Sequence, residues 1–216
     1  YGGGHYSAAA SMQTFFEDGP KRDRRLWIGD LRLEALTNYY TFNNLKIVKR
    51  CLYLFAAGEC NELGFLPSFI YENPYYHSGK THIEDYALLD VVSVCDYYEH
   101  TGDTDVVNDL LEICKSQLES FRSTLDLNLI ATKQEGWFVF IDWCPGLECM
   151  TALQGVYLYT LERFCELLYA IGDEEYEKYS ALISEVRYAS KKHLYNRSKG
   201  CFVNVLDDGQ LSVHSQ

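Results

Sequence analysis

Helical periodicity dominates the hydrophobic pattern of this chain, and the helices it predicts come in pairs. Apolar residues recur at helical spacing over 83–100 and 104–121, on either side of Thr101-Gly102-Asp103. The same order returns seventy residues later over 155–195, with Gly172-Asp173 at the centre. Glycine commonly follows the end of a helix, and aspartate or threonine commonly caps the start of the next. The pattern therefore predicts two helical hairpins that repeat one structural unit.

A further pair of helices is predicted over residues 30–57, with a break at Asn43-Asn44. Glu34 lies one turn beyond Asp30, near any pocket that Asp30 enters, but the simpler interpretation is an exposed helix glutamate. The residues expected to face the core are Leu33, Leu36 and Tyr40 in the first helix, and Leu45, Val48, Leu52 and Phe55 in the second.

The connections between these pairs carry short β patterns. Residues 137–143 alternate loosely like a strand before the turn Cys144-Pro145-Gly146, and 199–216 have strand character around an Asp208-Gly209 turn. The connection 60–80 is long and rich in aromatic residues, which makes it a candidate cleft wall, with core packing as the alternative. The prediction is an all-α fold with short β segments in its connections.

The stretch from Asp18 to Asp30 concentrates charge in an order that an ordinary surface helix would not need. Gly19-Pro20 opposes a regular helix start, so 18–25 is predicted to be a loop. A helix is expected to begin near Asp30, whose carboxylate would cap it. Asp18, Asp23 and Asp30 cannot share one helical face, so they converge only if the loop folds over a pocket. The alternative interpretation is a solvated charge run.

The order Asp-x-Pro-x-Arg-(Glu/Asp)-Arg-x-x-Trp-x-Gly-Asp in this stretch resembles the signature of the bacterial α-L-rhamnosidases of glycoside hydrolase family 78. The resemblance implies a six-hairpin α/α toroid, with residues 1–216 forming an incomplete catalytic domain. It also implies roles for individual residues, with Asp23 as the general acid. The substrate-binding residues implied are Asp18 and Asp30 as sugar ligands, Arg22 as a positioning cation, and Trp27.

Two departures qualify that resemblance. Many members have Glu where this chain has Asp23, and the shorter side chain places the proton about one carbon–carbon bond further back. The family's general base is a glutamate from a later part of the barrel, and it has no matching position here. Inverting hydrolysis needs an acid and a base roughly 6.5 to 9.5 Å apart, and Asp23 supplies only the acid. The isolated chain is therefore expected to be inactive.

A second segment also resembles the family, whose sequences carry a similar aromatic run that ends in Asp-Trp. In this chain the pair is Asp142-Trp143, expected to supply an acid for sugar hydroxyls and an indole for a sugar face, whereas Trp137 is assigned to the core. The family's architecture would also bring Glu84 and Asp85 towards the pocket. Helix capping is the alternative for both acids. The arginines of the 18–25 loop are expected to face away from the pocket.

Composition narrows the function classes. The 216 residues are 47% hydrophobic, enough for one domain with a core, and the net charge of −12 argues against nucleic acid or an anionic membrane as partner. The eight cysteines form no CxxC pair, so no metal or other cofactor is expected. Their scatter favours a reducing, cytoplasmic location, with disulfides as the alternative. No apolar run is long enough to cross a bilayer.

The leading hypothesis is an inverting glycosidase that acts on α-L-rhamnosides or related glycosides. Two other classes stay open: a non-catalytic carbohydrate-binding or degenerate glycosidase-like domain, and a structural helical-repeat module. The expected partner is a carbohydrate. The pattern accounts for three to four of the six hairpins, so the last of them is expected to expose an apolar face through which the chain would self-associate.

Overall fold

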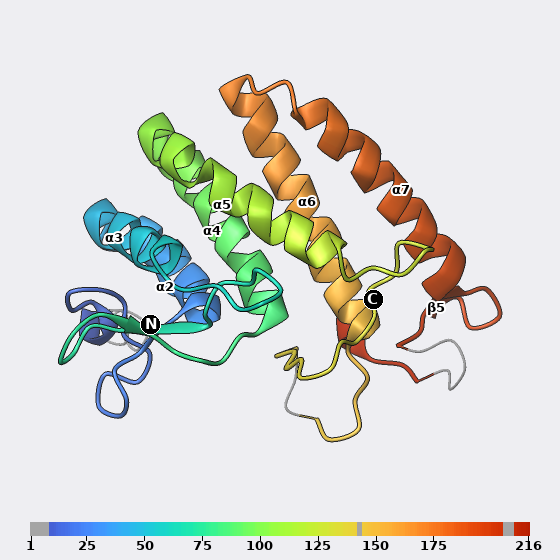
Figure 1. The fold of residues 1–216 in the computed structure, drawn as a ribbon, viewed down its shortest axis with the longest axis horizontal. Helices are drawn as coiled ribbons and strands as arrows, with labels where there is room; N and C mark the ends of the chain where they lie inside the picture. Colours follow the sequence, from blue (N-terminus) through green and yellow to red (C-terminus); the bar gives the residue numbers. More distant parts are fainter. Residues whose placement is uncertain (1–8, 142–143, 205–209) are drawn as a thin grey trace.

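The computed structural model describes residues 9–141, 144–204 and 210–216. Its helices form three consecutive antiparallel hairpins, which lie side by side (Figure 1). The two hairpins predicted from the Gly-Asp repeat, and the one predicted over 30–57, are confirmed. The helices are α2 (Ile28–Tyr40) with α3 (Leu45–Ala56), α4 (Glu84–Thr101) with α5 (Thr104–Arg122), and α6 (Met150–Ile171) with α7 (Tyr176–Leu194).

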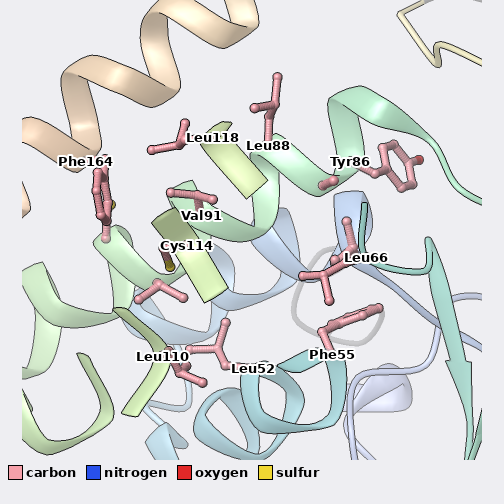
Figure 2. Close-up of a cluster of buried hydrophobic side chains, with 14 of the residues drawn as sticks. Leu52, Phe55, Leu66, Tyr86, Leu88, Val91, Leu110, Cys114, Leu118 and Phe164 are labelled. Atoms are coloured by element: carbon pink, nitrogen blue, oxygen red, sulfur yellow. The ribbon is translucent and has the colours of Figure 1, made fainter. Parts of the chain in front are cut away.

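The first helix of each hairpin forms an inner row. Helix α4 packs against α2 on one side and α6 on the other, and also contacts its own partner α5. Because neighbours cover it on several sides, α4 is buried from Glu84 to Tyr97 with only Leu89 partly exposed. Figure 2 shows Leu52 and Phe55 of α3, Val91 of α4, Cys114 and Leu118 of α5 and Phe164 of α6 converging in the core. The inner row is therefore a rigid support for whatever lies at its ends.

The turns inside the hairpins follow the repeated glycine and aspartate. Gly102 (φ 65°) and Gly172 (φ 77°) end α4 and α6 in the left-handed conformation, which glycine adopts without a steric penalty. Asp103 Oδ1 accepts a hydrogen bond from Val106 N at 3.2 Å and caps α5. Asp173 Oδ1 accepts one from Glu175 N at 2.9 Å. These local interactions explain why the sequence located both turns.

The predicted core face of α2 is wrong for Leu33 and Tyr40, while Leu36 is partly buried against the core, and that of α3 is largely right. Leu33 and Tyr40 are 64% and 81% exposed, and the residues α2 buries are Ile28, Leu31, Ala35, Asn38 and Tyr39. That stripe also has helical spacing, but a small residue and an amide hide it in the sequence. Asn38 bonds both the N–H and the C=O of Asn44, so it belongs to the α2–α3 turn. Val48, Leu52 and Phe55 are buried as predicted, and Leu45 is partly buried.

Short strands tie the connections together. In a three-stranded antiparallel sheet, β1 (Leu26–Trp27) pairs with β2 (Phe69–Tyr71), which pairs with β3 (His77–Ser78). Near the end of the described chain, β4 (Tyr195–Asn196) pairs with β5 (Cys201–Phe202), followed by a short 3-10 helix, η1 (Val213–Ser215). The Asp208-Gly209 turn lies outside the described residues.

The strand predicted over 137–143 is wrong for 137–141, where no residue is in a strand; the last two positions are not described. Trp137 packs in the core, and Phe140 N donates to a side chain, Asp85 Oδ1, instead of to a neighbouring strand.

The long connections lie together at one end of the helices, opposite the short hairpin turns (Figure 1). The N-termini of α2, α4 and α6 face this end. Among the residues described, no helix is long and apolar enough to span a membrane. The end that holds the loops and three helix N-termini is where Asp18, Arg22, Asp23, Trp27 and Asp30 lie.

Candidate active site

The loop of residues 18–25, called here the acid loop, has its two ends paired. Asp18 N donates to Arg25 O at 2.8 Å, and Arg22 N donates to Gly19 O at 2.7 Å. The predicted loop is confirmed. The predicted cap is wrong: α2 begins at Ile28, its N-cap is Trp27 without a side-chain cap, and Asp30 is already in the first turn. The strand β1 leads directly into the helix, so no acid is needed to start it.

A pocket of about 360 Å³ lies between the acid loop, the first turns of α2 and α4, and the segment before Asp142. The three acids predicted to converge reach it from two directions, Asp18 and Asp23 from the loop and Asp30 from α2. Asp142 and Trp143 lie outside the described residues. The pocket is lined by Asp18, Arg22, Asp23, Trp27, Asp30, Thr81, Ile83, Tyr86, Phe138 and Phe140.

The prediction that the arginines of the acid loop face away from the pocket is wrong for one of them. Arg24 does point elsewhere, with Nε 3.3 Å from Glu17 Oε2. Arg22 lines the pocket, and its Nη2 lies 3.3 Å from Asp18 Oδ2. The prediction assumed an extended loop, but residues 19–23 form bends and turns, so a side chain four positions after Asp18 returns to it. The pocket therefore holds a cation among its carboxylates.

The carboxylates differ in how they are compensated. Asp23 Oδ2 lies 3.2 Å from Arg25 Nε, while its Oδ1 is buried and has no hydrogen-bond partner in the described part of the chain. Burial, and then the charge of Asp18, raise the pKa of Asp30 to about 6. The pocket thus contains one carboxyl group with an unpartnered oxygen, that of Asp23, and one acid, Asp30, whose pKa is raised to about 6.

Glu34 is an acid that the sequence interpretation placed wrongly. It is partly buried one turn beyond Asp30, and burial raises its pKa to about 8, with a hydrogen bond to Ser11 acting against the rise and the charges of Asp30 and Asp18 adding to it. The available signal was its spacing, because residues four apart lie on the same helix face. The covering segment around Ser11 could not be predicted.

Aromatic rings form the apolar side of the pocket. Trp27 meets Tyr86 edge to face with ring centroids 6.3 Å apart, and Tyr86 meets Phe140 in the same way at 5.7 Å. Gly29 permits this arrangement, because a Cβ at that position would lie 2.5 Å from the Tyr86 ring. The glycine of the sequence signature therefore lets α2 pack against the ring that lines the pocket.

Glu84 and Asp85 support the pocket from behind. Both are buried and neither lines it, and neither caps α4, whose N-cap is Ile83. Asp85 Oδ1 accepts a hydrogen bond from Phe140 N at 2.9 Å, which fixes the wall segment. Burial raises the pKa of Asp85 to about 6 and that of Glu84 to about 7. Neither acid is therefore a pocket ligand or the N-cap, and Asp85 instead positions the wall segment.

The aromatic connection 60–80 contributes less to the cleft than one interpretation proposed. Phe65 is in the core and Phe69 packs against Trp27 with ring centroids 4.6 Å apart, while Tyr75 is largely exposed. The pocket is lined instead by Thr81 and Ile83, just beyond this connection. The core-packing interpretation is therefore confirmed for Phe65 and Phe69. Trp137, assigned to the core, is indeed buried beside Phe65. Within the described ranges, no group of His, Cys, Asp and Glu could hold a metal ion.

Rows of paired helices with an acid-lined pocket at their loop end define an (α/α) hairpin-type domain. Residues 4–215 match the family model of the bacterial alpha-L-rhamnosidase six-hairpin glycosidase domain. The chain therefore belongs to that family, and its mostly helical fold is that of the family's domain. No curated protein matched the chain.

Solved structures agree with this assignment. A rhamnosidase from Klebsiella oxytoca with rhamnose bound is 33% identical and superposes with a TM-score of 0.91, covering 98% of this chain and 41% of its own. The rhamnosidase of Bacillus sp. GL1 (21% identity, TM-score 0.79, coverage 97% and 22%) and the alpha-L-rhamnosidase from Dictyoglumus thermophilum (19%, 0.75, 94% and 23%) share the fold. The chain thus spans less than half the length of these relatives.

Proposed function

We propose that this chain is part of the catalytic domain of a glycoside hydrolase that cleaves α-L-rhamnosides or related glycosides with inversion. The observation that carries the proposal is the convergence of Asp18, Asp23 and Asp30 in one pocket beside Trp27 and Tyr86. Two acids from a loop and one from a helix meet there, in a chain of the rhamnosidase family. The Klebsiella relative is described with rhamnose bound, which supports this sugar class.

Asp23 is proposed as the general acid. Its Oδ1 has no hydrogen-bond partner among the residues described, and we assign to this oxygen the proton that passes to the glycosidic oxygen of the leaving group. Its other oxygen is held by Arg25. An inverting mechanism also requires a base that activates water on the opposite face of the sugar ring, roughly 6.5 to 9.5 Å from the acid. That base is assigned to no residue of 1–216.

The remaining pocket residues are proposed to bind the sugar. Asp18 and Asp30 would accept hydrogen bonds from hydroxyl groups, and Arg22 would donate to a ring or hydroxyl oxygen. Asp30, with a pKa raised to about 6, can also donate when it is protonated. The flat face of Trp27 would pack on sugar C–H groups. Asp142 and Trp143 are proposed as further sugar ligands from the sequence resemblance alone.

The test is kinetic and uses the natural full-length protein with an aryl α-L-rhamnoside. Asp23→Ala is expected to lower turnover by roughly two to four orders of magnitude, the usual contribution of a general acid. Asp23→Glu is the matched control, because it keeps a carboxylic acid. Proton NMR of the first product would show inversion. Unchanged turnover in Asp23→Ala would remove Asp23 from the role.

A non-catalytic carbohydrate-binding domain is the second candidate. The observation that favours it is Asp23 itself, whose side chain is one methylene shorter than the glutamate of many relatives. Binding of rhamnose by the full-length protein, measured by calorimetry without any hydrolysis of aryl rhamnosides, would establish it. The cytoplasmic location and self-association of the isolated chain stay predictions, which fractionation and sedimentation would check.

A further inference from the structure

Arg25 lies directly behind the proposed general acid and is not a pocket-lining residue. It is the last residue of the acid loop and precedes β1. Its Nε is 3.2 Å from Asp23 Oδ2, an ion pair rather than a hydrogen bond, since Nε has no hydrogen-bond partner among the residues described, and both side chains are 31% exposed. The main chain of Arg25 also closes the acid loop by accepting a hydrogen bond from Asp18 N. One residue is therefore joined to the loop through its backbone and to the acid through its side chain.

The guanidinium of Arg25 is surrounded by aromatic rings. Its Cζ lies 4.8 Å from the centroid of the Phe69 ring, 5.1 Å from that of Tyr71 and 5.9 Å from that of Trp27. Rings at such distances attract a cation through their π faces, and a guanidinium also stacks on them. An arginine with three ring contacts has little freedom to change rotamer.

The rings are held in turn by the three-stranded sheet. Strand pairing places Trp27 opposite Phe69 and Tyr71 opposite His77. Phe69 meets Tyr71 edge to face with centroids 5.4 Å apart, and Tyr71 stacks on His77 at 4.5 Å. The guanidinium therefore packs on β2, a strand that is distant from the acid loop in the sequence, and this gives the loop an external support.

We propose that Arg25 is a positioning residue for the general acid. It holds Oδ2 of Asp23 on the side of the rings, so that Oδ1 faces the pocket with the proton. This inference rests on the proposed function, because it concerns the acid of that reaction. A flexible loop alone would let the carboxyl group rotate, and a rotated acid would protonate the leaving oxygen less often. Arg25 therefore acts through Asp23 and not on the substrate.

The experiment compares two substrates that differ in their need for acid catalysis. Phenyl α-L-rhamnoside has a poor leaving group that must be protonated, whereas 2,4-dinitrophenyl α-L-rhamnoside leaves readily without a proton. In the natural full-length protein, Arg25→Gln is expected to lower kcat for the phenyl substrate by about 100-fold, the low end of a general acid's contribution. The loss for the dinitrophenyl substrate is expected to be about threefold or less, with KM little changed for both.

Three further variants make the result specific. Lys21→Gln removes an exposed cation of the same loop that forms no ion pair with any described residue, and it should change neither substrate's kcat. Arg25→Lys keeps the charge without the planar guanidinium and should recover part of the loss. Tyr71→Leu removes one ring from behind Arg25 and should reproduce a weaker form of the same selective loss. The last two variants serve as the test if Arg25→Gln does not fold.

The outcomes separate this inference from the proposed function. Selective loss on the phenyl substrate supports a positioning role for Arg25. Equal losses on both substrates, or no loss on either, would overturn that role while the glycosidase assignment stands. Failure of the wild-type protein to hydrolyse either substrate would overturn the proposed function, and the inference with it.

Discussion

Two groups of acids and arginines, one between the inner helices and one at the pocket, differ in how completely their charges are paired. In the first group, Asp96 of α4 accepts from Arg32 Nε of α2 at 2.9 Å and from Arg163 Nη2 of α6 at 3.2 Å. Arg163 also bonds Glu99 at 2.6 Å. In the second group, at the pocket, Asp30 lies only two residues before Arg32 and forms no ion pair with any described residue.

The difference separates a structural role from a chemical one. The group centred on Asp96 joins the three inner helices, and each buried charge in it has an opposite partner, which is the condition for tolerating such charges in a core. At the pocket, Asp18 and Asp23 pair with arginines. Asp30 and the neighbouring Glu34 keep the cost of burial, which is why their pKa values are raised. Natural proteins retain such uncompensated acids mainly where they bind or react.

The largest expected effect breaks the paired group. Asp96→Ala should lower the free energy of unfolding by about 3–5 kcal/mol, because it leaves Arg32 and Arg163, both mostly buried, without their shared partner. Glu166→Ala is the control, since that partner of Arg163 is largely exposed and should cost less than about 1 kcal/mol. Urea denaturation of both variants gives the comparison. Equal losses of unfolding free energy in the two variants would contradict the idea that Asp96, the partner shared by Arg32 and Arg163, stabilises the fold more than an exposed acid does.

A smaller effect is expected for a buried acid that belongs to neither group, since it forms no ion pair with a described residue and does not line the pocket. Asp90 of α4 is buried, its Oδ1 has no partner in the described chain, and burial raises its pKa to about 7. A raised folded pKa gives stability that is present below the unfolded pKa of 3.8 and is lost as pH rises through about 7. Asp90→Asn does not titrate, so its stability should exceed the wild type's by a margin that grows between pH 5 and pH 8.

The expected growth in that margin is on the order of 2–3 kcal/mol. Denaturant unfolding at several pH values measures it, and the other buried acids cancel because both proteins contain them. Glu185→Gln, at an exposed position of α7, should show a constant margin. A margin for Asp90→Asn that does not change with pH would contradict the raised pKa of this acid.

The smallest effect sharpens the pocket side of the comparison. Asp85→Ala removes the acceptor for Phe140 N and should loosen the wall segment, raising KM for an aryl rhamnoside about tenfold, equivalent to about 1.4 kcal/mol. Asp85→Asn keeps an acceptor oxygen and should stay close to the wild-type KM. If both variants behave alike, the hydrogen bond does not position the wall.

The parts of the fold that were predicted correctly depend on local chemistry. Gly102, Gly172 and their following aspartates form turns by themselves, so the hairpins could be located from their order alone. The acid loop was likewise predicted, because Gly19-Pro20 excludes a helix. The face of α2 was not, since Ala35 and Asn38 gave no apolar signal for the stripe that neighbouring segments cover.

The errors in the candidate site arise from contacts between distant segments. The exposed interpretation of Glu34 is wrong because nothing near it in the chain shows that Ser11 forms a hydrogen bond with it. The prediction that Arg22 faces away from the pocket is wrong because it assumed an extended loop. The support of Asp23 by Arg25 requires that Trp27 pairs with Phe69, more than forty residues away.

By itself, the sequence determined the helical hairpins, their Gly-Asp turns, the acid loop and the family whose signature this loop carries, because each depends on residues close together in the chain. Only the tertiary structure decided which acids are paired, which are buried with raised pKa values, and which oxygen of Asp23 has no partner among the residues described. Pairing and burial are set by the elements that happen to pack against a residue, and in this chain those elements are strands and helices tens of residues away.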